Sequence, residues 1–144
     1  VQDSRAIVRE CPARDWACEG KTIYDYTFDE VVTYRNDPVF MEWIQSPGYT
    51  LYVDGSSDCD DQATLVGGFD TSIGRGFRLG AYMLDREKAE AGEYSHVLGE
   101  MGVRLPDGSV RWLGQDTVAR KGFGWTPPEK EWFGPPNFLI VSSP

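Results

Sequence analysis

The chain has 144 residues, a formal net charge of −9, and 40% hydrophobic and 13% aromatic residues. This length suits one domain with one core, and the hydrophobic content excludes a disordered chain. The excess of acidic side chains disfavours nucleic acid and anionic lipid as partners, and no apolar run reaches the roughly 20 residues of a membrane-spanning helix.

The first half of the chain predicts short strands and one helix. Strands are expected at 6–8, 21–28, 31–34, 49–53 and 63–66. In the second of these, Tyr24, Tyr26 and Phe28 alternate along one face, as in a half-buried strand. A helix is expected at 37–45, because Asp37 can cap it and a proline follows at the first helical position.

The second half predicts a meander of strands. They are expected at 77–84, 94–105, 110–118 and 138–141. The segment 106–109 reads Pro-Asp-Gly-Ser, which is turn chemistry between two alternating runs and predicts a hairpin. Residues 85–91 lack an apolar stripe and predict an exposed helical turn or loop, and 122–136 form a loop rich in Gly, Pro and Trp.

These elements predict a single, mainly β domain over residues 1–144. About eight short strands with one short helix favour an antiparallel, calycin-like β-barrel, and a two-sheet β-sandwich is the alternative. A barrel of about eight strands can hold one small ligand inside. A small-molecule ligand or substrate is therefore the expected partner, and the sequence does not predict the oligomeric state.

The one histidine predicts where acid–base chemistry would occur in such a barrel. Strand alternation places Tyr94, His96 and Glu100 on one face, so His96 would act as a base that Glu100 orients. Asp116 completes the expected catalytic group. The alternative is that this face is an ordinary polar surface, since one side of an antiparallel strand commonly faces water.

Aromatic side chains would form the wall of the ligand cavity. The residues expected to bind the ligand are Tyr24, Tyr26, Tyr82, Tyr94, Trp112 and Trp125. The leading hypothesis is a small-molecule-binding barrel, which as an enzyme would be a cofactor-free isomerase, cyclase or lyase. Two alternatives stay open: a secreted, lectin-like carbohydrate-binding module that uses the late tryptophans, and a protein-interaction or inhibitor domain.

The segment from Asp54 to Asp61 is the most distinctive local feature. Oxygens of Asp54, Ser56, Asp58 and Asp60 alternate as they do in calcium-binding loops. The pattern lacks the glycine and the glutamate that an EF-hand requires, so a solvated acidic loop is the preferred interpretation and no metal ligand is assigned. Neither nucleotide-binding glycine motif is present, and the sequence predicts no cofactor.

Three cysteines leave the cellular compartment open. Cys11 and Cys18 are close enough in sequence for a local disulfide, which would leave Cys59 over in a secreted protein. The start at Val1 would suit a mature end after removal of a signal peptide. Three reduced cysteines in a cytosolic protein are the alternative.

Overall fold

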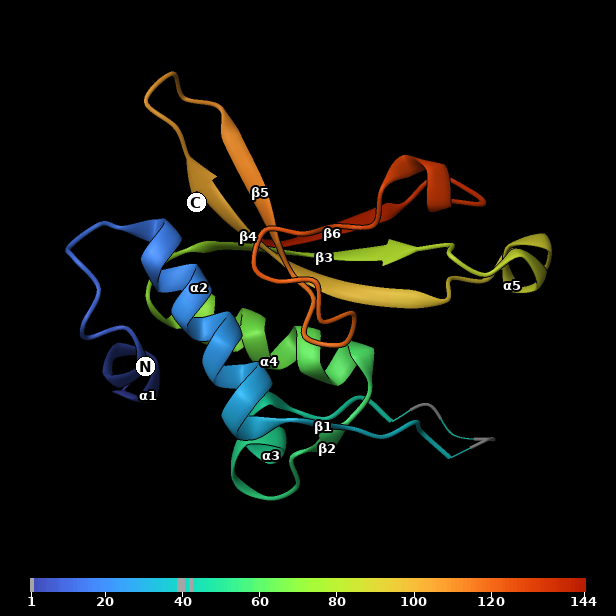
Figure 1. The fold of residues 1–144 in the computed structure, drawn as a ribbon, viewed down its shortest axis with the longest axis horizontal. Helices are drawn as coiled ribbons and strands as arrows, with labels where there is room; N and C mark the ends of the chain where they lie inside the picture. The colour runs from blue at the N-terminus through green and yellow to red at the C-terminus, as the bar shows by residue number, and fades with distance from the viewer. Residues whose placement is uncertain (1, 39–40, 42) are drawn as a thin grey trace.

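A four-stranded antiparallel sheet with helices against one face forms the centre of the computed structural model (Figure 1), which describes residues 2–38, 41 and 43–144. The strand order is β5-β4-β3-β6. The strands are β3 (Gly76–Tyr82), β4 (His96–Arg104), β5 (Val110–Gln115) and β6 (Asn137–Ser142). Because β5 and β6 are edges, the sheet is open.

The predicted barrel and the alternative sandwich are both wrong. The fold is mixed α/β, with 35% of residues in helices and 24% in strands. The helices are α1 (Gln2–Ile7), α2 (Trp16–Tyr26), α3 (Pro47–Tyr52), α4 (Cys59–Ser72) and α5 (Arg86–Glu90). A π-helical turn follows α2 (Thr27–Val31), a 3₁₀ turn covers Glu129–Glu131, and β1 (Thr33–Tyr34) pairs in parallel with β2 (Ser56–Ser57).

The strand predicted at 21–28 is mostly helix α2. Its aromatic residues are two apart in sequence, but Tyr24 and Phe28 are also four apart, and their rings stack at 6.0 Å on one side of the helical segment. Asp15 caps the helix by accepting a hydrogen bond from the backbone N–H of Cys18. The spacing of these aromatic residues is therefore compatible with a strand and with a helix, and the N-cap at Asp15 favours the helix.

Three further predictions in the first half are wrong. Residues 6–8, 49–53 and 63–66 lie in or beside helices α1, α3 and α4 instead of strands. In the predicted helix 37–45, residues 39, 40 and 42 lie outside the described residues, and the described ones carry no helix. Helix α3 begins only after this segment, at Pro47, because the side chain of Ser46 accepts a hydrogen bond from the N–H of Tyr49 and caps the helix there.

The four strands predicted in the second half are confirmed within a few residues, and the hairpin joins β4 to β5. Residues 86–90 form the expected exposed turn of helix α5. Cys11 and Cys18 form a disulfide, and Cys59 is a free thiol. Within the described ranges, no helix is long and apolar enough to cross a bilayer.

Helix α4 connects the sheet to the other helices. It packs against β3 and β4 on one side and against α2 and α3 on the other. One core cluster joins Ile23 of α2 to Leu65, Val66 and Phe69 of α4. A second cluster lies on the sheet and contains Met101, Val103 and Leu113. This packing fixes the first turn of α4 relative to the ends of β4 and β5.

Candidate active site

Cys59 is the first residue of α4. β2 leads directly into this helix (Figure 1). Asp58 occupies the N-cap position with extended backbone. The N–H groups in the first turn of a helix have no acceptor within the helix, and the helix dipole favours negative charge there. The sulfur of Cys59 is therefore placed where an anion is stabilised.

His96 and Asp116 form a hydrogen-bonded pair at the ends of two neighbouring strands. His96 begins β4, Asp116 directly follows β5, and Nε2 of the imidazole lies 2.6 Å from Oδ2 of the carboxylate. Oδ1 of Asp116 accepts from the backbone N–H groups of Val118 and Ala119 at 3.0 and 2.9 Å. Asp116 is held rigidly by these bonds and in turn orients the imidazole.

Cys59 lies near enough to His96 to act on its pKa. Burial of the imidazole opposes its charged form, but the hydrogen bond and charge of Asp116, with a further contribution from the Cys59 sulfur, raise the pKa of His96 to about 9. Since Nε2 faces Asp116, Nδ1 is the nitrogen that remains for the thiol. A protonated imidazole at this position stabilises a neighbouring thiolate.

These three side chains have the arrangement that nucleophilic catalysis requires. A nucleophile lies beside a base, and a buried carboxylate orients that base. The side chains of His96 and Asp116 are 14% and 2% exposed, so their mutual attraction is little screened by water, whereas Cys59 is only partly buried. Cys59 is therefore partly accessible to solvent beside a buried ion pair.

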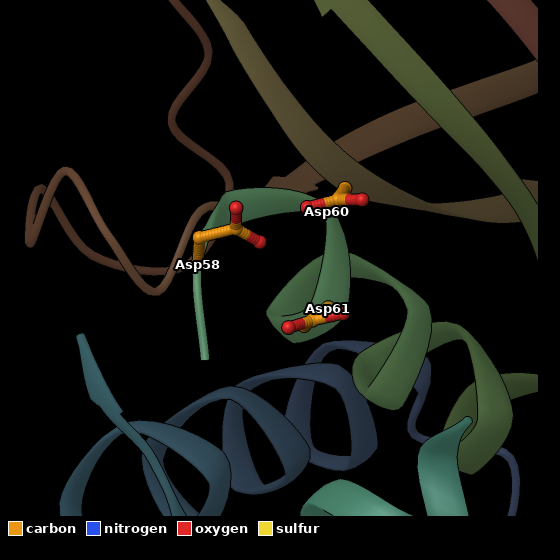
Figure 2. A group of neighbouring side chains, drawn as sticks. All are labelled: Asp58, Asp60 and Asp61. Carbon is orange, nitrogen blue, oxygen red and sulfur yellow. The ribbon is translucent and has the colours of Figure 1, made fainter. Parts of the chain in front are cut away.

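Three carboxylates flank Cys59 at the start of α4: Asp58, Asp60 and Asp61 (Figure 2). One oxygen from each lies within 4.8 Å of the others. Burial and the neighbouring Asp60 raise the pKa of Asp58 to about 8, and burial also raises the pKa of Asp61. The carboxylates repel one another in the absence of a cation.

The donor atoms of this cluster fit a hard divalent cation. Among the described residues, one buried oxygen of each of Asp58, Asp60 and Asp61 has no hydrogen-bond partner. Oxygen donors of this kind suit calcium. The sequence interpretation named Asp54 and Ser56 as donors, but Asp54 pairs with Arg35 at 2.9 Å and accepts from the backbone of Ser56.

The structure brings together two of the three residues that the sequence assigned to catalysis, His96 and Asp116. The third, Glu100, is buried elsewhere on the sheet: it accepts from Arg78 at 2.6 and 2.8 Å and from the hydroxyl of Tyr82 at 2.8 Å. Burial and the Glu100 carboxylate raise the pKa of Tyr82. Glu100 therefore holds the sheet residues around it rather than orienting His96.

The six residues expected to bind a ligand lie in separate places. Tyr24 accepts from the N–H of Gly122, and Tyr26 packs edge-on against Phe69. Trp112 carries the guanidinium of Arg78 at 4.7 Å from its ring centre. Tyr82 is buried and Tyr94 is 40% exposed. The backbone carbonyl of Trp125 packs against Gly114.

Sequence reasoning missed Cys59, which it treated as a leftover thiol in an acidic loop. The signal that could have found it is the segment from Ser57 to Asp61, where a capping residue precedes the cysteine and acids occupy the first helical turn. A cysteine at the start of a helix, with a histidine and an aspartate later in the chain, fits a nucleophile and its two partners.

No protein-family model matches the chain, and no curated protein matches it in sequence. Among solved structures, the chain is similar to LapG from Legionella pneumophila in a calcium-bound form. The TM-score is 0.57 and the identity 16%, over 84% of this chain and 68% of that one. At this identity the likeness shows a shared mixed α/β fold.

Proposed function

We propose that this chain is a cysteine-dependent acyl-transfer enzyme that acts on amide bonds of polypeptides. Cys59 is the nucleophile, His96 is the general base and acid, and Asp116 is the residue that orients His96. The observation that carries the proposal is that Asp116 is hydrogen-bonded to His96, while Cys59 at the N-terminus of α4 is near enough to the same imidazole to influence its pKa.

The reaction follows from the roles of these groups. The thiolate of Cys59 forms a bond to the carbonyl carbon, and the electron pair moves to the carbonyl oxygen, which the free N–H groups at the start of α4 would stabilise. The oxyanion then collapses, the C–N bond breaks, and protonated His96 gives its proton to the leaving amine. Water or another amine, deprotonated by His96, releases the acyl group from the thioester.

The acidic cluster at Asp58, Asp60 and Asp61 supports a calcium site in the same enzyme. Two observations support this site. One oxygen of each carboxylate has no hydrogen-bond partner among the described residues, and the similar LapG structure is calcium-bound. A bound cation would offset the negative charge beside Cys59, which otherwise opposes the formation of a thiolate. The three carboxylates would hold the ion, and Cys59 stays free to react.

Alkylation of Cys59 by iodoacetamide tests the proposal without knowledge of the substrate. With Cys11 and Cys18 in a disulfide, Cys59 is the thiol that reacts. We expect rapid labelling at pH 7, measured by mass spectrometry, and a rate roughly tenfold or more lower in His96→Ala, because the imidazolium that stabilises the thiolate is lost.

The matched control is Lys88→Ala, which removes a cation from exposed helix α5 and should leave the rate unchanged. Circular dichroism of each variant establishes that it is folded. An equal labelling rate in wild type and His96→Ala would contradict the assignment of His96 as the base.

A further inference from the structure

A pocket of about 490 Å³ is lined by β2 and by residues of the segment between β1 and β2. We call it the Trp43 pocket. Its lining includes Arg35, Asp37, Trp43, Tyr49, Asp54 and Ser57. Ser57 is two residues before Cys59, and its carbonyl accepts from the backbone N–H of Arg35 at 2.9 Å. One end of the pocket is therefore formed by β2, the strand that leads into α4 and its first residue, Cys59.

Exposed aromatic rings form one wall of this pocket. Trp43 is 54% exposed and Tyr49 is 42% exposed, although large aromatic side chains are usually well buried. An indole face attracts cations and also packs against the aliphatic stems of lysine and arginine. The rings thus offer a surface for a long, positively charged side chain.

The charged groups of the pocket leave one carboxylate uncompensated. Arg35 is paired with Asp54 at 2.9 Å, so these two charges cancel. Asp37 accepts a hydrogen bond from the backbone N–H of Trp43, and no cation pairs with it among the described residues. Asp37 also lies close enough to Asp58 and Asp61 for its charge to act on both.

Ser57 gives an independent sign that a polar group belongs here. The residue is 1% exposed, and its hydroxyl has no hydrogen-bond partner among the described residues. A buried hydroxyl without a partner is costly, so Ser57 is an unsatisfied polar group in a residue that lines the pocket. A purely apolar side chain would leave the charge of Asp37 uncompensated, and an acidic one would be repelled.

We propose that the Trp43 pocket receives a lysine or arginine side chain of the polypeptide that Cys59 attacks, an assignment that rests on the proposed function. The aliphatic stem lies against Trp43, and the cationic head donates to Asp37. The pocket thereby selects positively charged segments and places the neighbouring amide bond at the sulfur of Cys59.

Peptidyl chloromethyl ketones that differ in one side chain test this specificity. They alkylate a catalytic cysteine directly, so the second-order rate constant of inactivation reports binding beside Cys59. We expect the lysine and arginine reagents to react about tenfold faster than the alanine reagent, and the glutamate reagent to react slowest. All rates are measured in the presence of calcium.

Variants then assign the preference to the pocket. In Asp37→Asn and Trp43→Ala the ratio of the lysine rate to the alanine rate should fall severalfold, and a ratio cancels any general change in thiol reactivity. Glu90→Gln removes an equal charge from exposed helix α5 and should keep the wild-type ratio.

The outcomes separate this inference from the proposed function. Equal rates for all reagents, or the fastest rate for a phenylalanine reagent, would overturn the cation assignment and leave a reactive Cys59 in place. An unchanged ratio in both pocket variants would overturn it as well. If no reagent and no iodoacetamide modified Cys59, the proposed function would fall together with the inference.

Discussion

Two buried carboxylates, Asp116 and Asp70, differ in their hydrogen-bond partners. Asp116 accepts two backbone N–H bonds and pairs with His96, so every oxygen has a donor. Asp70 in α4 is equally buried, but it accepts only a 3.4 Å bond from Gln115, and its second oxygen has no partner among the described residues. Both oxygens of Asp116 are therefore satisfied by hydrogen bonds, whereas one oxygen of Asp70 is not.

Asp70 therefore makes the stability of the fold depend on pH. Burial raises its pKa from 3.8 to about 8; the hydrogen bond from Gln115 and the charge of Arg75 oppose this shift, and Glu19 adds to it. Between pH 4 and 8 the folded state retains a proton that the unfolded state has released. The contribution of this group to the free energy of unfolding consequently falls as pH rises through that range.

We expect Asp70→Asn to remove this dependence. The free energy of unfolding of the variant should be closest to that of wild type near pH 4. As pH rises the variant should become more stable than wild type, by at least about 1 kcal/mol at pH 8. Urea unfolding at several pH values measures the difference. If the difference in free energy of unfolding between variant and wild type stayed constant from pH 4 to 8, Asp70 would already be ionised in the folded protein over this range.

At the scale of elements, two glycines set how closely α4 approaches the sheet. A Cβ atom on Gly67 would lie 2.2 Å from Cε1 of Phe77, and one on Gly99 of β4 would lie 2.8 Å from Cε2 of the same ring. The ring of Phe77 is thus held between a helix and a strand.

Gly67→Ala should destabilise the protein by about 1–3 kcal/mol, although alanine favours helix more than glycine does. Gly48 in α3 is the matched control, because a Cβ there meets no atom within 4 Å. Gly48→Ala should stabilise by about 0.5 kcal/mol. Urea unfolding of both variants decides the matter, and a stabilised Gly67→Ala would contradict the close packing.

The same glycines explain why local sequence predicted the sheet better than the helices. β3 alternates in hydrophobicity, a Pro-Asp-Gly-Ser turn joins β4 to β5, and β6 is a short apolar run rich in β-branched residues, so these patterns favour strands. In α4, the β-branched residues and paired glycines of 63–68 suggest a strand and a turn, whereas in the helix Gly67 leaves room for the ring of Phe77, a tertiary contact that the local pattern does not show.

At the scale of the whole molecule, the candidate site exists because three distant segments meet. Positions 59, 96 and 116 come from a helix start, a strand start and a strand end. Alternation placed His96 on a strand and allowed Asp116 to be named, because both properties are local. The contact with Cys59 depends on the packing of α4 against the sheet, which no local pattern encodes.

The balance of charge in the molecule leads to the last prediction, that calcium stabilises the fold. The chain carries a net charge of −9, and three of its carboxylates crowd the start of α4. A cation held there relieves their repulsion in the folded state, and unfolding disperses the site. At a concentration about 100-fold above the dissociation constant, binding adds about 2.7 kcal/mol to the free energy of unfolding.

For a chain of this length, that gain corresponds to a rise in Tm of several degrees. Thermal unfolding followed by circular dichroism in calcium, in magnesium and in chelator measures it, and magnesium should give the smaller shift because it dehydrates reluctantly. Asp61→Asn should lose most of the calcium response, whereas Glu93→Gln, an exposed change of equal charge, should keep it. A response to calcium that is the same in both variants would place the ion elsewhere, because only Asp61 belongs to the cluster beside Cys59.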